Sequence, residues 1–260
     1  MNQLPLMSLA SPESLATKRE LSFVLLHGAW HGGWCWQRVA TMLRAHAHLV
    51  STPTQTGVGE RRHLLADSVD FDTFVSDICN HLLFEDLRDV TLVGHSFGAS
   101  VAAAVADRDH DRIGGMIFLD GFLPESDRSL MEQRAPEIAR ERIRAAERTS
   151  GGLSMPVPAV EVFGIKSERD RQWVAAKLTP HPLRTYVSKI RLGHPLGNGL
   201  PCDYVICTNP RYPGTDWSVE TARRHGWRIH ELRAGHDAMI DAPAATAELL
   251  EEIALQHRLP

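Results

Sequence analysis

The chain has 260 residues, of which 43% are hydrophobic and 23% are charged, and its formal net charge is −4. This length fits one domain of ordinary size, or one core that carries an inserted subdomain, with enough apolar residues for a buried interior. The small negative charge gives no electrostatic reason to expect nucleic acid or an anionic membrane as a partner, and no apolar run reaches the length of a membrane span.

Residues 1–20 are rich in Ser, Pro and Ala and lack the basic region and apolar stretch of a signal peptide. We therefore predict a loose N-terminal leader and a cytoplasmic protein. The cysteines show no C-x-x-C spacing, and most lie in or beside apolar segments. Two disulfides would fit the count, but reduced, buried thiols are the simpler interpretation. The four residues are Cys35, Cys79, Cys202 and Cys207.

Strands alternate with helices in the first half of the chain. Residues 21–26 form an apolar run that suits a strand buried on both faces, and residues 34–46 place apolar side chains at helical spacing. The elements expected next are a strand at 47–51, a helix at 71–83, a strand at 89–93, a helix at 99–106 and a strand at 113–119. Repeated strand–helix units predict an α/β fold with a mostly parallel central sheet flanked by helices.

The pattern changes after Gly121, where three helices are expected at residues 125–148, 166–178 and 181–189. We interpret residues 121–200 as an inserted helical cap on a core formed by residues 21–120 and 201–260. The alternation resumes with strands at 203–207 and 228–232 and helices at 219–225 and 242–257. The charged helix at 125–148 fits a solvated cap surface better than a dimer contact, so the oligomeric state, including a homodimer, stays open.

Gly94-His95-Ser96-Phe97-Gly98 matches the G-x-S-x-G pattern between a predicted strand and a predicted helix. At such a turn the glycines avoid collisions with neighbouring backbone, and the serine hydroxyl is lifted above the carboxyl edge of the sheet. The bare pattern often arises by chance, but this context favours a nucleophile over a serine that only caps the helix. We therefore predict that Ser96 is a nucleophile.

A serine hydroxyl needs a base, and His236 is the best candidate. It lies between the last predicted strand and the last helix, in a loop at the same edge of the sheet. A loop histidine is often only a surface residue. The order of nucleophile first and histidine later nevertheless favours His236 as the general base.

The acid that orients the histidine is less clear from the sequence. Residues 208–211, directly after the strand at 203–207, contain no acid, and Asp216 lies further along. Asp120 directly follows the strand at 113–119, and the order Ser96, Asp120, His236 is a known one. We favour Asp120 over Asp216 as this acid. The alternative for Asp120 is a structural role as a turn residue that caps the end of the strand. Asp237 directly follows His236, so in an extended loop its side chain would point away from the imidazole.

Two backbone N–H groups must hold the oxyanion of an acyl-transfer intermediate. We assign them to Phe97, directly after the nucleophile, and to Ala29, in the loop after the first strand. The predicted substrate pocket consists of Trp30, Trp34, Phe122 and Leu123, although Trp34 could equally be a core residue of the helix that it starts. Neither a cofactor nor a metal is expected.

Several sequence blocks resemble the esterase and hydroxynitrile lyase branch of the α/β-hydrolases, which includes plant methylesterases and bacterial pyrethroid-hydrolase-like esterases. The blocks are residues 27–36 (HGAWHGGWCW), 52–61, 94–98, 119–125 and 235–239, and they look closest to the bacterial members. The resemblance implies an α/β-hydrolase fold and a cofactor-free enzyme that acts on small esters. The hydroxynitrile lyases carry a lysine close after the catalytic histidine, and this chain has none there.

The leading hypothesis is therefore hydrolysis of a small apolar carboxylic ester or lactone through an acyl-enzyme. A second class keeps Ser96 and His236 but uses them in a cofactor-free lyase, cyclase or oxygenase reaction. A third is a ligand-binding protein without turnover, against which the intact Ser96 and His236 argue. In each case the partner is a small molecule, and the sequence does not identify it.

Overall fold

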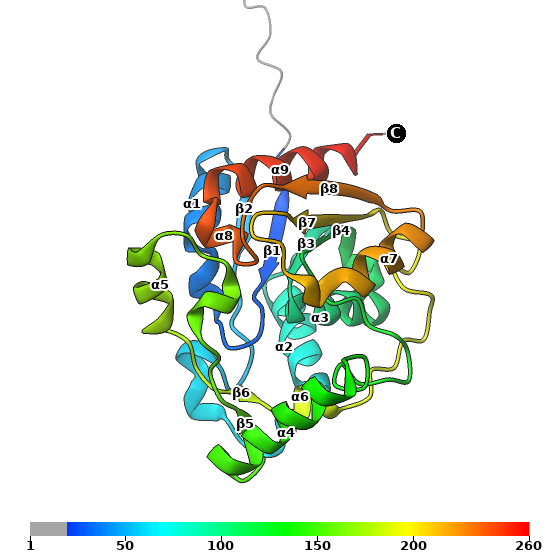
Figure 1. Ribbon diagram of the computed structural model, residues 1–260. Helices are drawn as coiled ribbons and strands as arrows, with labels where there is room; N and C mark the ends of the chain where they lie inside the picture. The colour runs from blue at the N-terminus through cyan, green and yellow to red at the C-terminus, as the bar shows by residue number, and fades with distance from the viewer. Residues whose placement is uncertain (1–19, 260) are drawn as a thin grey trace, which may run out of the picture.

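The computed structural model describes residues 20–259 and shows a central sheet of six parallel strands (Figure 1). Their spatial order is β2-β1-β3-β4-β7-β8, so the chain starts near one edge and ends at the other. The strands are β1 (Ser22–Leu26), β2 (Leu49–Ser51), β3 (Val90–His95), β4 (Ile113–Leu119), β7 (Cys202–Cys207) and β8 (Arg228–Leu232). The predicted leader falls on residues 1–19, outside the described residues, and on Glu20.

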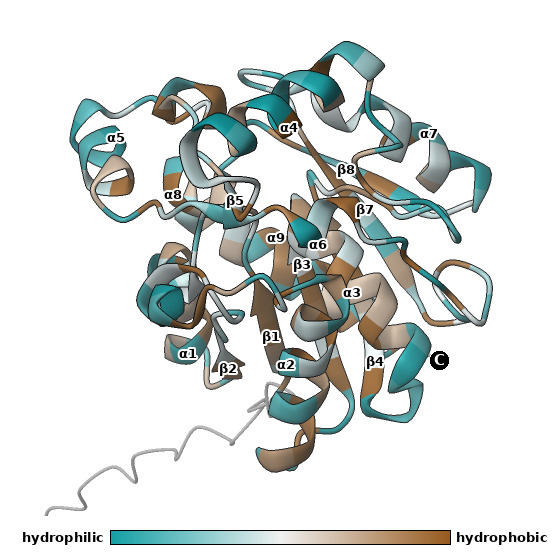
Figure 2. Cartoon of the chain, turned by 90° about the horizontal axis from the view of Figure 1, so that it is seen from below, coloured by the Kyte–Doolittle hydropathy of each residue, from teal (hydrophilic) through white to brown (hydrophobic). Residues whose placement is uncertain are grey.

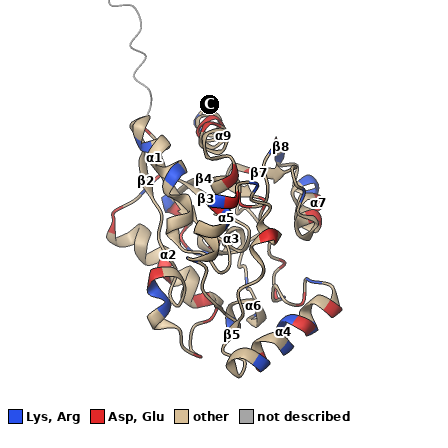
Figure 3. Ribbon diagram, turned by 60° about the vertical axis from the view of Figure 1, so that its left-hand side comes forward, with Lys and Arg blue, Asp and Glu red and all other residues tan. Residues whose placement is uncertain are grey.

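Helices cover both faces of this sheet. Helices α1 and α9 pack against each other on one face, and α2 and α3 pack against each other on the opposite face (Figures 1 and 3). The helices are α1 (Gln37–Ala45), α2 (Phe71–Phe84), α3 (Phe97–Arg108), α4 (Pro136–Ser150), α5 (Glu168–Ala175), α6 (Arg184–Val187), α7 (Asp216–Arg224), α8 (Ala238–Asp241) and α9 (Pro243–Gln256). This three-layer arrangement confirms the predicted fold class.

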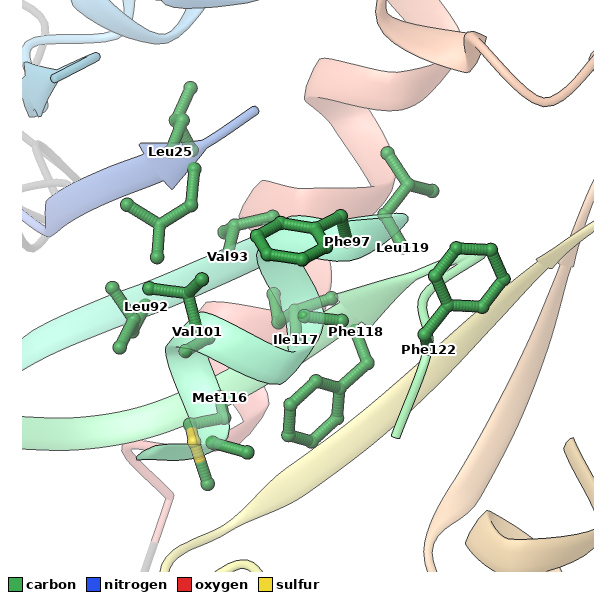
Figure 4. Packing of buried hydrophobic residues seen from close by; sticks show 14 of the residues in the cluster. Leu25, Leu92, Val93, Phe97, Val101, Met116, Ile117, Phe118, Leu119 and Phe122 are labelled. Carbon is green, nitrogen blue, oxygen red and sulfur yellow. The ribbon is translucent and has the colours of Figure 1, made fainter. Parts of the chain in front are cut away.

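The interior is apolar because the central strands are buried on both faces. Figure 2 shows β1, β3 and β4 as largely hydrophobic, whereas α4 and α5 at the periphery are largely hydrophilic. Figure 4 shows Phe97 and Val101 of α3 next to β3, which carries Leu92 and Val93, and all four side chains are almost fully buried. Each such side chain contributes about 1.5–3 kcal/mol to folding. This packing fixes α3, and with it the residue that precedes it.

The core elements follow the predicted pattern, with shifts of a few residues at the ends. The strands at 113–119 and 228–232 have the predicted bounds. The helix predicted at 99–106 begins earlier, at Phe97, and the predicted helix at 34–46 divides into a 3-10 turn, η1 (Gly33–Trp36), and α1. The C-terminal helix, α9, begins at Pro243, one residue after its predicted start, and the separate short helix α8 precedes it at Ala238–Asp241.

The intervening segment, residues 121–200, differs more from the prediction. The helix expected at 125–148 begins only at Pro136, because proline has no N–H and favours the first helical position, while Ala135 before it is extended. Residues 181–189 are not one helix but a short strand, β6 (His181–Pro182), followed by α6. β6 pairs with β5 (Ser154–Met155) in a separate two-stranded ribbon. The predicted division into a core and an inserted cap stays a prediction.

Four further 3-10 turns lie outside the central sheet, namely η2 (Gly59–Leu64), η3 (His110–Arg112), η4 (Val160–Phe163) and η5 (Pro213–Thr215). The four cysteines are free thiols, and three of them are buried. Within residues 20–259, no helix has both the length and the apolar character needed to cross a membrane.

Candidate active site

Ser96 occupies the turn between β3 and α3. Its backbone has φ 52° and ψ −119°, which bends the chain sharply from strand to helix. Two glycines make this turn sterically possible. A Cβ atom at Gly94 would lie 2.5 Å from the Cα of Ala99, and one at Gly98 would lie 2.5 Å from the carbonyl oxygen of His27. No L side chain fits at either position, so the glycines of the motif are required by packing.

A hydrogen-bonded relay links Ser96 to two side chains that are distant in sequence. Nε2 of His236 lies 3.0 Å from Oγ of Ser96, and Nδ1 of His236 lies 2.6 Å from Oδ2 of Asp120. All three side chains are buried or nearly so. Because a carboxylate only accepts hydrogen bonds, Nδ1 carries a proton and Nε2 is free to accept the proton of the serine hydroxyl.

Asp120 is held by contacts on its other oxygen. Oδ1 accepts hydrogen bonds from the hydroxyl of Thr215, at 3.2 Å, and from the N–H of Cys207, at 3.4 Å, and a guanidinium nitrogen of Arg211 lies 3.6 Å away. Asp216, the rival acid, is 65% exposed and pairs with Arg211 rather than with His236. The structure therefore brings Asp120, and not Asp216, to the imidazole.

Three residues of this site have a strained backbone. Trp30, Ser96 and Asp120 all have positive φ angles, of 66°, 52° and 42°, a region that residues other than glycine rarely adopt. Each such residue costs on the order of 1–3 kcal/mol, which the surrounding packing must offset. Such strain is typical of functional sites.

The two predicted oxyanion donors belong to the segments that adjoin Ser96. Phe97 is the first residue of α3, and no acceptor within residues 20–259 takes its N–H. The N–H of Ala29 is likewise without a partner in the described chain, and Ala29 lines the cavity above Ser96. A Cβ at Gly28 would come within 3.1 Å of the Cβ of Ser96, so this loop approaches the serine closely. The positive end of α3 favours negative charge here.

A cavity of about 120 Å³ opens above the serine. Its walls contain residues from the first loop, the serine turn, the intervening segment and the loops after β7 and β8. They are Gly28, Ala29, Trp30, His31, His95, Ser96, Phe122, Arg142, Pro158, Val162, Phe163, Tyr186, Tyr212 and His236. Trp30 and Phe122 are therefore in the wall, as predicted.

Two of the predicted pocket residues lie elsewhere. Trp34 stacks on His31 and meets the ring of Trp173 edge to face at 5.1 Å, so its indole contacts His31 and α5 and is not in the cavity wall. Leu123 is fully buried, and its N–H donates to the hydroxyl of Ser218. Leu123 points into the core because it directly follows Phe122, and successive side chains of an extended chain face opposite ways.

The model of the alpha/beta hydrolase family matches residues 23–249, which is most of the chain. The chain belongs to this family. A carbendazim-hydrolysing esterase of Nocardioides sp. (strain SG-4G) is 36% identical to this α/β hydrolase over 248 residues, which cover 88% of the chain and 98% of the relative.

Two further relatives agree with this assignment. Methylesterase 2 of Arabidopsis thaliana is 34% identical over 147 residues, covering 52% of this chain and 50% of the plant protein. Among solved structures, an extracellular alpha/beta-hydrolase from a Paenibacillus species, described as sharing homology with Tobacco Salicylic Acid Binding Protein 2, is 26% identical with a TM-score of 0.79. It covers 90% of this chain and 98% of its own. The α/β hydrolase described here is thus a hydrolase with esterase relatives.

The sequence analysis missed a second polar network beside the relay of this α/β hydrolase. Asp237 contacts Nε2 of His31 at 2.9 Å, and Nδ1 of His31 contacts the carbonyl oxygen of Ala29 at 2.8 Å. Nε2 of His95 lies 2.9 Å from the carbonyl oxygen of His236. All of these groups are buried. The network connects the first loop to the loop of the general base.

The partners of these rings determine their protonation. Both nitrogens of His31 face acceptors, so both donate and the ring is a cation paired with Asp237. Burial alone would lower the pKa of His31, but the charge of Asp237 and the hydrogen bonds to it raise that pKa above its ordinary value. Burial lowers the pKa of His95 well below its usual range, and the neighbouring His236 adds to this effect, so His95 is neutral.

This ion pair predicts a pH-dependent stability. Burial would raise the pKa of Asp237, but the charge and hydrogen bond of His31 lower it. The stabilisation from Asp237 is therefore present above its ordinary pKa of 3.8 and lost as the pH falls through the lowered one. The stabilisation from His31 is complete below its ordinary pKa of 6.5 and is lost as the pH rises through the raised pKa of His31.

Asp237→Asn is expected to lower the free energy of unfolding by about 3 kcal/mol near pH 6, because a buried cation loses its counter-charge. The loss should shrink as the pH rises through the raised pKa of His31, so pH 6 is compared with pH 9. Urea unfolding at both pH values measures this difference, with Asp111→Asn, at a side chain that is 95% exposed, as the control. Equal losses at both pH values would show that the pair is not ionised.

Proposed function

We propose that this α/β hydrolase cleaves small carboxylic esters or lactones through an acyl-enzyme formed on Ser96. The observation that carries this proposal is the buried relay from Ser96 through His236 to Asp120 beneath the cavity. A relay of this kind converts a weakly nucleophilic hydroxyl into one that attacks a carbonyl carbon.

The proposed reaction has two halves. Oγ of Ser96 bonds to the ester carbonyl carbon while its proton passes to Nε2 of His236, and the N–H groups of Ala29 and Phe97 stabilise the oxyanion. The intermediate collapses, and His236 returns the proton to the departing alcohol. Water then attacks the acyl-serine with His236 as base, which releases the acid and restores the hydroxyl. Asp120 stabilises the imidazolium in both halves.

The cavity walls favour an apolar substrate. Trp30, Phe122, Phe163, Tyr186 and Tyr212 present aromatic surface, and such walls bind small aryl or alkyl groups. The names of the relatives point the same way, since one is a carbendazim-hydrolysing esterase and another is a methylesterase. We also propose a cytoplasmic location, because the four free thiols suit a reducing compartment.

Labelling with a fluorophosphonate tests the acyl-enzyme mechanism. We expect one adduct per chain, located on Ser96 by peptide mass spectrometry, with a parallel loss of p-nitrophenyl acetate hydrolysis. Ser100 lies one turn further along α3 and serves as an internal control, because its hydroxyl donates to the carbonyl oxygen of Phe122 and should stay unlabelled.

Other results would favour the other classes. Turnover that consumes dioxygen, or that continues in the fully labelled protein, would favour a cofactor-free oxygenase, lyase or cyclase. Tight ligand binding without turnover of any activated ester would favour a binding protein.

A further inference from the structure

Two arginines of the intervening segment lie over the aromatic surface of the cavity. Arg142, on α4, lines the cavity itself, and its guanidinium carbon lies 5.4 Å from the centre of the Trp30 ring. Arg134, just before α4, lies 4.1 Å from the centre of the Phe122 ring. Both guanidinium carbons also lie within 6 Å of the ring centre of Tyr186, at 5.7 Å for Arg134 and 5.8 Å for Arg142.

Neither of these arginines has a carboxylate partner within residues 20–259. Nε of Arg134 and Nη1 of Arg142 are buried and have no hydrogen-bond partner in the described chain. Other arginines of the same helix behave differently, because Arg140 pairs with Glu137 and Arg148 pairs with Glu141 on the exposed face. Figure 3 shows these alternating basic and acidic positions along α4. Arg134 and Arg142 therefore differ from these two paired arginines, because they are partly buried and have no carboxylate beside them in the described part of the chain.

Two cations that lie close together without an anion are unfavourable in a partly desolvated site. Burial lowers the pKa of Arg134, and the charge of Arg142 acts in the same direction, although a guanidinium remains protonated. The aromatic faces of Trp30, Phe122 and Tyr186 attract the guanidinium groups, and Tyr186 also hydrogen-bonds both of them, but Nε of Arg134 and Nη1 of Arg142 still lack an acceptor among residues 20–259. A ligand anion would supply both the missing charge and the missing acceptors.

We propose that Arg142 and Arg134 form an anion subsite that binds a carboxylate on the part of the substrate remote from the scissile ester. The preferred substrates are then carboxylate-bearing esters, such as half-esters of dicarboxylic acids. This inference rests on the proposed ester hydrolysis at Ser96. It goes further by adding a charge requirement that the apolar wall alone does not predict.

Two activated esters of similar length test this subsite. Mono-p-nitrophenyl glutarate carries a carboxylate at the far end of its acyl group, whereas p-nitrophenyl pentanoate is neutral. We expect the wild-type kcat/KM to be higher for the glutarate ester. In Arg142→Met the ratio of the two kcat/KM values should fall by about 10- to 100-fold, as expected for lost hydrogen bonds to a charged group.

Arg144→Met is the matched control, because Arg144 lies on the same helix with an exposed side chain, and it should leave the ratio unchanged. An unchanged ratio in Arg142→Met would overturn the proposal, as would a wild-type preference for the pentanoate ester. If neither ester is hydrolysed by the wild type, the proposed function itself fails, and that result is distinct from a lost preference.

A measurement on the wild type avoids dependence on how the variant folds. Glutarate should inhibit pentanoate ester hydrolysis competitively, and the neutral diamide glutaramide should not. Rising ionic strength should weaken the inhibition by glutarate, since the attraction is between charges. Equal inhibition by the acid and the diamide, or none by either, would show that the two arginines do not select an anion.

Discussion

Ser96→Ala is expected to lower kcat for p-nitrophenyl acetate by about 10⁶-fold, the order found when a serine nucleophile is removed from an intact triad. The variant keeps the cavity, the N–H groups of Ala29 and Phe97 and the imidazole of His236, so substrate binding should change little. The expected signature is therefore a collapse in kcat with a nearly constant KM. Steady-state kinetics with purified protein measure both quantities.

Ser76→Ala provides a control, because this serine lies on α2, away from the cavity, where its hydroxyl accepts from Arg108. Its activity should stay close to that of the wild type. Substantial turnover by Ser96→Ala would contradict a covalent mechanism and would leave His236 as a base for another reaction. The fluorophosphonate adduct should also be absent from Ser96→Ala.

Asp120→Asn is expected to lower kcat by about 10⁴-fold. The asparagine has the same shape but presents an amide, so it no longer requires a proton on Nδ1 of His236. If the ring then carries its proton on Nε2, it cannot accept the proton of Ser96. The fold should survive, since the contacts to Thr215 and Cys207 on the other oxygen can remain.

Asp216→Asn is the informative partner of this experiment, because Asp216 is the other acid that the sequence offers. Its carboxylate is exposed and pairs with Arg211, so its loss should change kcat by only a few-fold. A near-normal rate in Asp120→Asn together with a large loss in Asp216→Asn would reverse the assignment of the acid.

The sheet and the relay could be predicted from the sequence because they depend on local patterns and on chain order. The strand before Ser96 and the small residues after it define the turn, and the absence of an acid at residues 208–211 directs attention to Asp120. The start of α4 at Pro136 was missed, although proline favours the first turn of a helix. The run of charges before it concealed that boundary.

The second network could not be predicted, because it depends on contacts between remote loops. Asp237 pairs with His31 across 206 positions, and no spacing rule links two such residues. The sequence also did not predict that the side chain of Arg142 faces the cavity. Residues 136–150 form a charged helix, and the pattern does not say which of its arginines faces the cavity and which face solvent.

The backbone at Ser96 has a consequence for how this chain responds to selection. Glycine adopts a φ of 52° without steric cost, whereas serine there is strained by on the order of 1 kcal/mol or more. Heat resistance alone would therefore reward Ser96→Gly, a substitution that abolishes the hydroxyl. Directed evolution for thermal stability therefore needs a simultaneous assay of turnover, because selection for stability alone would enrich stable but inactive variants.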